Sequence, residues 1–216
     1  MFFLFYTMQI SRRHLLLITF FAVFPQLLFS QQTGWEFNLL RSLAEKRTPS
    51  GNRFHERFTK LNGTICLAVP AGIFVTALIE KDKSLRNDAL FITESIVISS
   101  MMTWSLKKIV DRDRPAIRDP AFVAVINKEG PGFPSGHTSL AFSMATSLSM
   151  RYPKWYVMVP AFTYAGFTGY SRLYLGVHYP TDVLAGALVG SGSAWLTWKL
   201  NQWLHPSKKK RGVPAF

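Results

Sequence analysis

Residues 171–200 read SRLYLGVHYPTDVLAGALVGSGSAWLTWKL, in which a polar stretch ending at Asp182 passes directly into the apolar block Val183–Leu200. A helix of about 18 residues is about 27 Å long, close to the hydrocarbon thickness of a bilayer. The block also contains small residues that would let helices approach closely, namely Gly186, Ala187, Gly190 and Gly192. The stretch therefore predicts a packed membrane helix that begins beside a cluster of polar side chains.

Other apolar blocks precede this one along the chain. They are Asn62–Ile79, Ala89–Leu106, His137–Met150 and Trp155–Tyr170. The long apolar runs favour an all-α bundle of transmembrane helices over residues 62–203, and a soluble all-α domain with buried helices is the alternative. We expect five or six membrane helices, depending on the N-terminal segment.

The first 61 residues differ in character from the rest. The apolar run Leu15–Ser30 follows Arg12-Arg13, so residues 1–30 are either a cleaved signal peptide or a first transmembrane helix. Residues 31–61 are mixed in charge and are interpreted as an amphipathic segment on the outer face, with a soluble surface helix as the alternative. Within them, Thr48–Asn52 is predicted to be a loop.

The charge balance is strongly basic. There are 25 Lys and Arg against 12 Asp and Glu, a formal net charge of +13, yet only 17% of residues are charged and 48% are hydrophobic. Such a composition excludes a disordered basic tail, and without a nucleic-acid-binding motif we expect no nucleic-acid partner. The basic residues of the tail, residues 204–216, predict a cytoplasmic C-terminus by the positive-inside rule. The single Cys66 excludes an internal disulfide and a Cys-rich zinc site.

Three polar stretches flank the apolar blocks, and counting helices back from the tail puts all three on the outer face. They read KKIVDRDRP at 107–115, PSGH at 134–137 and SRLYLGVHYPTD at 171–182. Lys107, Arg114 and Arg172 are cations of the kind that hold phosphate oxygens. Ser135 and Gly136 precede a predicted helix, whose N-terminal N–H groups favour an anion. The set predicts a phosphate site.

Two histidines complete this predicted site. His178 and Asp182 are four residues apart, so the carboxylate can hold one ring nitrogen and leave the other as a neutral nucleophile. His137 is a candidate general acid for the leaving group. Any one of these motifs alone would more often be a helix cap, a structural hydrogen bond or a membrane-interface flank. Their joint occurrence on one face favours catalysis.

The three stretches together closely resemble the three-part signature of the type 2 phosphatidic acid phosphatase superfamily. Lys107 is separated by six residues from Arg114-Pro115, Pro134–His137 matches the second part, and Ser171-Arg172, His178 and Asp182 have the spacing of the third. The resemblance implies a helical bundle of the type shared by these phosphatases and the vanadate-dependent haloperoxidases. It also implies hydrolysis of a phosphate monoester or diphosphate without a metal or other cofactor.

The same resemblance implies a role for each residue. His178 would be the nucleophile, Asp182 its orienting partner and His137 the acid. The phosphate would be bound by Lys107, Arg114, Ser135, Gly136 and Arg172.

The membrane character points to a lipid phosphate as substrate, with membrane lipids as the other partners. Phosphatidylglycerophosphate, phosphatidic acid, a polyprenyl diphosphate and a lipid A phosphate all fit. We expect an integral protein of a bacterial inner membrane whose site faces the periplasm or outer side. The alternatives are a secreted soluble acid phosphatase, a vanadate-dependent haloperoxidase and a non-enzymatic lipid-phosphate-binding protein.

One apolar run lies inside a predicted loop. It is Ala121–Ile126, which we interpret as dipping into the interface beside the substrate entrance, with a short helix packed on the bundle as the alternative.

Overall fold

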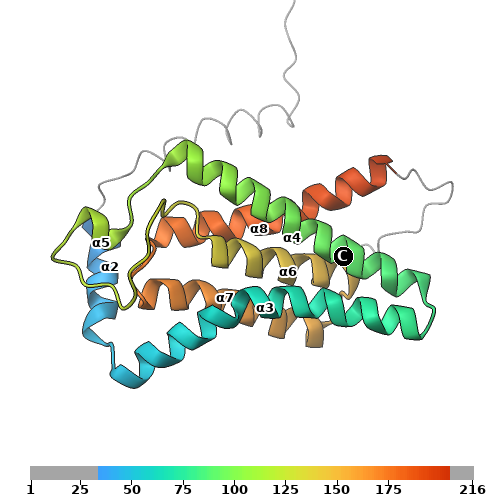
Figure 1. Ribbon diagram of the computed structural model, residues 1–216, viewed down its shortest axis with the longest axis horizontal. Helices are drawn as coiled ribbons and strands as arrows, with labels where there is room; N and C mark the ends of the chain where they lie inside the picture. The colour runs from blue at the N-terminus through green and yellow to red at the C-terminus, as the bar shows by residue number, and fades with distance from the viewer. Residues whose placement is uncertain (1–33, 205–216) are drawn as a thin grey trace, which may run out of the picture. The chain divides into compact units, whose positions relative to one another are not determined.

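The computed structural model describes residues 34–204, so the predicted leader and all of the basic tail after Leu204 lie outside the described residues. The described range contains seven helices and no strand, which confirms the all-α prediction. The helices are α2 (Gly34–Glu45), α3 (Pro49–Ile79), α4 (Lys83–Val110), α5 (Pro115–Arg118), α6 (Gly136–Arg151), α7 (Trp155–Tyr174) and α8 (Pro180–Leu204), and Figure 1 shows their arrangement.

The five long helices contain the five predicted apolar blocks, but α3 begins well before Asn62. Thr48 is its N-cap, and the Thr48 Oγ1 accepts a hydrogen bond from the Gly51 N–H at 3.1 Å. Pro49 follows at the first helical position, where its missing N–H is not needed. The prediction of a loop over Thr48–Asn52 is therefore wrong, because this sequence is a helix start.

Helix α6 lies in the middle of the bundle and contacts α3, α4, α7 and α8 (Figure 1). Its packing against α7 is built from alanines, Ala141 and Ala145 against Ala161 and Ala165. Larger side chains of α3 and α4, among them Cys66, Phe91, Ile92 and Ile96, pack with Met144 of α6 on the other side. The small side chains of α6 bring its neighbours close to its axis.

The glycines of α8 permit a close approach to α6. A Cβ added to Gly186 would lie 2.6 Å from the Ser135 carbonyl oxygen, and one added to Gly190 would collide with the Ser139 carbonyl oxygen. The prediction that small residues of this block let helices approach closely is confirmed for these two glycines. It is wrong for Gly192, because a Cβ there would meet nothing within 4 Å.

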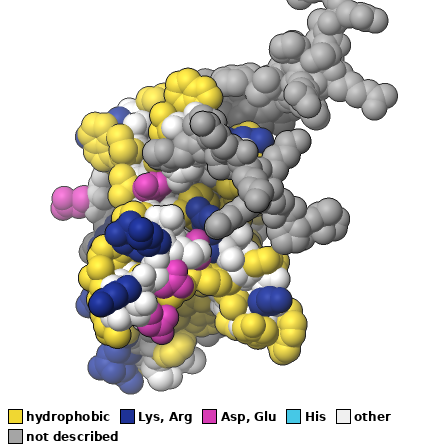
Figure 2. Space-filling model, turned by 90° about the vertical axis from the view of Figure 1, so that its right-hand side faces the viewer, with side chains coloured by type: hydrophobic (Ala, Val, Ile, Leu, Met, Phe, Trp, Pro, Cys, Tyr) yellow, Lys and Arg dark blue, Asp and Glu magenta, His cyan; other side chains and the backbone are white. Residues whose placement is uncertain are grey.

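Two helical stretches among the described residues, Pro49–Ile79 and Lys83–Arg118, are long and apolar enough to cross a membrane. At 31 residues, α3 is about 46 Å long, more than the hydrocarbon thickness, so one end of it extends past the apolar layer if it crosses. The turn between α3 and α4 and the connection between α6 and α7 lie at the same end, where Arg151 and Asp88 are 3.5 Å apart. Figure 2 shows Lys and Arg side chains among hydrophobic ones on this end.

The opposite end of the bundle carries α2, α5 and the segment between α5 and α6 (Figure 1). The run Ala121–Ile126 is not helical, so the alternative of a short packed helix is wrong. Phe122 is buried in a cluster with Leu40 and Tyr179, whereas Val123 is 76% exposed. The run is thus divided, with one side chain anchored in the bundle end and its neighbour pointing outward.

Candidate active site

All three polar stretches lie at helix ends, and the structure brings them to the end of the bundle that carries α2. Lys107 is in the last turn of α4, Gly136 is the first residue of α6, and Arg172 is in the last turn of α7. Asp182 is in the first turn of α8. The stretches touch directly, since the Ser135 N–H donates to the Asp182 carbonyl oxygen at 2.9 Å. The three polar stretches thus lie together at one end of the bundle, as the sequence predicts.

A sharp turn after α4 aims the first stretch into the site. Asp111 ends the helix in the left-handed region with φ 45°, a conformation that Asp tolerates better than most residues. The Gly132 N–H then donates to the Arg112 carbonyl oxygen at 2.7 Å, which ties the loop before α6 to this turn. Arg114 therefore reaches across to the loop between α7 and α8.

The site cations are held by carbonyl oxygens. Arg114 Nη1 donates to the Val177 carbonyl at 2.8 Å and its Nε to the Gly130 carbonyl at 3.0 Å. Lys107 Nζ donates to the Pro131 carbonyl at 2.7 Å. Neither makes an ion pair with a carboxylate within residues 34–204, so their charges are free to act on a ligand.

Arg172 is the third of these cations and is only 2% exposed. Its Nε is buried and has no hydrogen-bond partner among the described residues. A buried guanidinium nitrogen without an acceptor is unusual, because leaving it unpaired costs free energy. An anion with oxygens at its surface would satisfy it.

The contacts of His178 favour one tautomer. Arg114 Nη1 lies 3.3 Å from His178 Nε2, and because a guanidinium can only donate, this contact favours a lone pair on Nε2 and the proton on Nδ1. Nδ1 faces Asp182 Oδ2 at 3.5 Å, which is longer than a hydrogen bond. Contacts of this kind are often long without substrate and tighten during the reaction. The structure thus places Asp182 beside Nδ1 of His178, and the orienting role of Asp182 stays a prediction.

The surroundings of His178 keep it uncharged. It lies in the loop between α7 and α8, and burial lowers its pKa well below the ordinary value of 6.5, with Arg172, Arg114 and Lys107 lowering it further. An imidazole surrounded by three cations stays neutral through physiological pH, so its free nitrogen has a lone pair available.

Gly176 shapes the loop that carries His178. Its φ is +72°, and a Cβ there would lie 2.6 Å from Arg47 Nη2 and 2.8 Å from the ring of Phe122. Only glycine combines this backbone conformation with so close an approach.

The second stretch forms the N-terminus of α6. Ser135 is fully buried, and its Oγ accepts a hydrogen bond from Thr138 Oγ1 at 2.9 Å instead of capping the helix. Gly136 and His137 are partly exposed at the start of the helix. The Asn62 side chain donates to the His137 carbonyl at 3.2 Å, which anchors this turn to α3. All eight predicted site residues therefore lie at one bundle end.

The residues of this site lie within a range that matches a known protein family. Residues 88–206 of the 216 match the family model described as the PAP2 superfamily, a range that holds all three stretches. The chain belongs to the PAP2 superfamily. The resemblance noted from the three-part signature is confirmed.

Individual PAP2 relatives support the same conclusion. Undecaprenyl-diphosphatase of Sulfolobus acidocaldarius is 30% identical over 149 residues, covering 66% of this chain and 72% of the relative. Lipid A 4'-phosphatase of Bacteroides thetaiotaomicron is 35% identical over 97 residues, covering 42% and 43%. This PAP2 chain is accordingly a phosphatase, and both relatives are named for hydrolysing lipid phosphates.

A solved structure shows the same fold. The first transmembrane PAP2 type phosphatidylglycerolphosphate phosphatase from Bacillus subtilis superposes with a TM-score of 0.69 at 23% identity, covering 90% of this chain and 98% of that one. The match shows that this PAP2 chain shares the fold of a transmembrane phosphatase, and the two candidate spans within residues 34–204 fit a membrane protein.

The PAP2 signature omits two residues that the structure places in the same end. Arg112 lies between the signature positions of the first stretch, and Glu36 comes from α2, outside the matched range. Arg112 Nη1 donates to Asp182 Oδ1 and its Nη2 to Glu36 Oε2, both at 2.8 Å. One signal could have found Glu36: it stands four residues before buried Leu40, on the apolar face of an amphipathic helix.

Proposed function

We propose that this protein hydrolyses a membrane lipid phosphate or diphosphate through a phosphohistidine intermediate, without a metal ion. The proposal rests above all on one observation. Lys107, Arg114 and Arg172, none of them paired with a carboxylate in the described range, surround a neutral His178 whose Nε2 faces the same space. A phosphoryl group fits such a site, since its equatorial oxygens would accept from the cations.

In the first step, His178 Nε2 attacks phosphorus in line with the ester oxygen. The N–P bond forms as the P–O bond to the leaving group breaks, and His137 gives its proton to the departing alkoxide. The positive charge that develops on the imidazole is stabilised by Asp182 through Nδ1. The three cations and the N–H groups at the start of α6 stabilise the negative charge on the transferring oxygens.

In the second step, water attacks the phosphohistidine from the side the alcohol has left. His137, now neutral, accepts a proton from this water, the N–P bond breaks, and phosphate is released. His178 returns to its neutral form and His137 holds again the proton that it gave to the alkoxide, so the cycle balances.

A cavity beside the site suits an amphiphilic substrate. It has a volume of about 200 Å³ and is lined by Arg114 and Val177 together with Ile117, Ala124, Ile126 and Lys128. The apolar run Ala121–Ile126 contributes two of these side chains, which supports its interpretation as a segment beside the substrate entrance. Ile126→Glu is expected to reduce turnover of lipid substrates much more than that of a small soluble phosphomonoester. Equal loss on both would contradict this role.

The central test is a phosphate-release panel on the purified, detergent-solubilised protein. It compares phosphatidic acid, phosphatidylglycerophosphate, a polyprenyl diphosphate and a lipid A phosphate with a small soluble ester. We expect release from at least one lipid, inhibition by vanadate, no effect of a chelator and no turnover by His178→Ala. Full activity in His178→Ala would disprove the mechanism.

The intermediate can be trapped directly. With substrate labelled in the transferred phosphate, rapid denaturation in alkali should leave label on the wild-type protein and none on His178→Ala. His137→Ala should retain label longer than wild type on a substrate with a good leaving group, because only the hydrolysis of the intermediate then needs His137. Label on His178→Ala would place the nucleophile elsewhere.

We further propose that the site faces the outer side of a bacterial inner membrane. The native Cys66 is fully buried, so a single introduced cysteine reports its own surroundings. Glu129→Cys lies at the site end and Ser84→Cys at the other, and both positions are exposed. A membrane-impermeant maleimide added outside intact cells should label the first and not the second, and the reverse pattern would invert the topology.

A further inference from the structure

Helix α2 places a carboxylate inside the catalytic end of the bundle. Glu36 is 2% exposed although it comes from a segment of mixed charge ahead of the bundle. Its Oε1 accepts hydrogen bonds from the Thr181 hydroxyl at 2.7 Å and from the Thr181 N–H at 3.2 Å. Its Oε2 accepts from Arg112 Nη2 at 2.8 Å. Both carboxylate oxygens are therefore occupied, and both partners adjoin Asp182.

Arg112 connects Glu36 to Asp182. It is 7% exposed and divides its guanidinium between the two carboxylates, with ion-pair distances of 2.8 Å to each. Its Nη1 also donates to the Thr181 hydroxyl at 2.6 Å, and its guanidinium carbon lies 4.1 Å from the centre of the Tyr179 ring. This arginine is held on several sides, so it has one orientation.

The orientation of Asp182 follows from these contacts. Arg112 holds Oδ1, and the Tyr179 N–H donates to Oδ2 at 2.9 Å. Because each oxygen has its own donor, the carboxylate cannot rotate, and Oδ2 stays on the side of His178 Nδ1. The Glu36 charge balances Arg112, so Asp182 is not the only anion holding this guanidinium.

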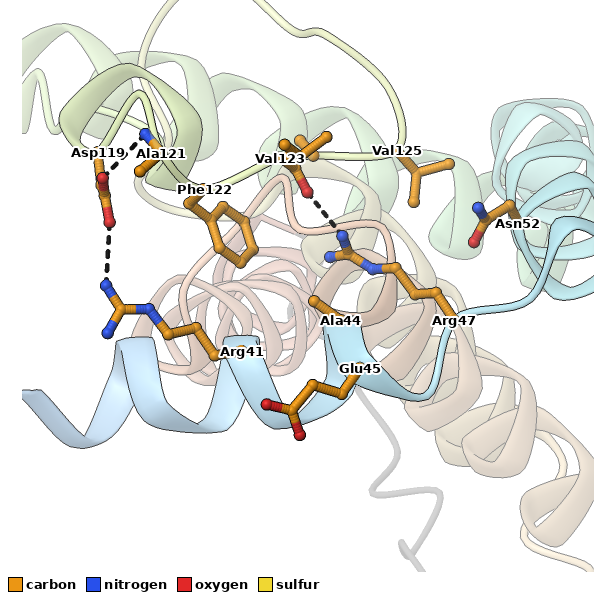
Figure 3. A pocket seen from close by; sticks show the side chains of 11 residues that line it. Arg41, Ala44, Glu45, Arg47, Asn52, Asp119, Ala121, Phe122, Val123 and Val125 are labelled. Carbon is orange, nitrogen blue, oxygen red and sulfur yellow. Dashed lines mark hydrogen bonds and ion pairs between the residues drawn. The ribbon is translucent and has the colours of Figure 1, made fainter.

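Further contacts fix α2 on the bundle end. Phe37 packs edge-to-face on Tyr179, with ring centres 5.4 Å apart, and Leu40 is fully buried. Figure 3 shows a second line of contact, where Arg41 reaches Asp119, at 3.1 Å, and Arg47 reaches the Val123 carbonyl, at 2.7 Å. The position of Glu36 is therefore determined by a helix with several independent anchors.

We propose that Glu36 and Arg112 are positioning residues for catalysis: Glu36 orients Arg112, and Arg112 holds Asp182 in the orientation that directs His178 at the phosphate. The inference rests on the proposed function, in which Asp182 orients the nucleophile. It extends the catalytic apparatus beyond the three signature stretches into the segment that precedes the bundle. A residue that only stabilised the fold would make the same contacts, so the test must separate the two roles.

A double-mutant cycle on kcat separates them. Glu36→Gln keeps the size and one carbonyl oxygen but removes the charge, and we expect kcat to fall about tenfold with KM changed less than about twofold. Asp182→Asn should reduce kcat by about 10³-fold or more. If Glu36 acts through Asp182, adding Glu36→Gln to Asp182→Asn should reduce kcat no further.

The matched control lies on the same helix. Arg41→Gln removes an ion pair of α2 whose arginine is 59% exposed, and it should leave kcat unchanged. Size-exclusion profiles in detergent show whether each variant is folded. If Glu36→Gln is not folded, Thr181→Val replaces it, because this removes the hydroxyl between Glu36 and Arg112 without changing charge, and kcat should fall about threefold.

The outcomes are distinguishable. Loss of kcat in Glu36→Gln that disappears in the Asp182→Asn background supports the proposal. The same fractional loss in both backgrounds, a change in KM alone, or unchanged kcat in a folded Glu36→Gln or Thr181→Val would overturn it. Activity in His178→Ala, or no activity in the wild type, would instead defeat the proposed function.

Discussion

Arg112 and Arg114 are two residues apart in one stretch, yet they lie in opposite electrostatic regions. On one side, Arg112 is bracketed by Glu36 and Asp182, at 2.8 Å from each. On the other, Arg114 shares its side of the site with Lys107 and Arg172, and its partners are carbonyl oxygens and an imidazole nitrogen. In one region, called balanced below, each charged group has an ion-pair partner inside the protein, and in the other, called unbalanced, the cations have none among the described residues.

The difference distinguishes residues that orient other side chains from residues that bind the ligand. A buried charge with well-placed partners is held in one geometry, which suits a residue that orients others. A buried cation without a counter-charge raises the free energy of the folded protein, and an anionic ligand would lower it. The unbalanced region is where we expect phosphate, and the balanced region is what keeps the nucleophile aligned.

The largest expected effect comes from the unbalanced region. Arg172→Met should reduce kcat/KM by about 10³- to 10⁵-fold, the range found for arginines that stabilise phosphoryl transfer. The same substitution removes a buried cation, so the unfolding temperature in detergent should stay the same or rise. Activity assays and thermal unfolding of the one variant measure both. A marked fall in unfolding temperature would mean that Arg172 is balanced after all.

The next effect is on stability and comes from the balanced region. Arg112→Met leaves Glu36 and Asp182 buried without their shared partner, which should cost about 3–5 kcal/mol of folding free energy. For a domain of this size, such a loss lowers the unfolding temperature by about 10 °C. Thermal unfolding of Arg112→Met and Arg172→Met under the same conditions measures this loss directly. Equal unfolding temperatures for the two variants would remove the distinction between the regions.

A smaller effect is expected from the packing of α8 against α6. Gly190→Ala should destabilise the protein by about 1–3 kcal/mol, since its Cβ would collide with the Ser139 carbonyl of α6. Gly192→Ala, two residues along α8, has nothing within 4 Å and is the matched control. It should be neutral or slightly stabilising, because alanine favours the helix. Destabilisation by both would show that helix contact is not the cause.

The smallest effect is on pH dependence. Because burial and the cations of the unbalanced region lower the pKa of His178 well below 6.5, the imidazole stays neutral as pH falls below that value. A histidine with its ordinary pKa would lose about threefold of its neutral form between pH 7 and pH 6. We expect little loss of kcat/KM from this group over that range.

The measurement needs two substrates whose own ionisations differ, a monoester and a diphosphate, so that substrate titration can be separated. A threefold loss between pH 7 and pH 6 with both would contradict a depressed His178 pKa.

Much of the fold and of the site could be predicted from local spacing. The five apolar blocks mark the long helices, since burial in a bundle or bilayer requires runs of apolar residues. His178 and Asp182 could be paired in advance, because a side chain just before a helix start lies close to one in the first turn of that helix. The loop predicted over Thr48–Asn52 was an avoidable error, as Thr followed by Pro is a helix start. Gly190 and Gly192 are the same residue type in the same apolar block, so the sequence predicts the same packing role for both. Only the structure shows that Gly190 contacts α6 and that Gly192 does not.

The amino-acid sequence by itself determined the helical class, the family and the eight residues that we expect to act on phosphate, because each of these depends on periodicity or on fixed spacing. Only the tertiary structure decided which charges are balanced. Glu36 and Arg112 are 76 residues apart, and Glu36 and Thr181 are 145 apart. Contacts over such distances are set by how α2 packs on the bundle end, where Leu40 and Phe37 bury their apolar faces and bring one carboxylate inside with them.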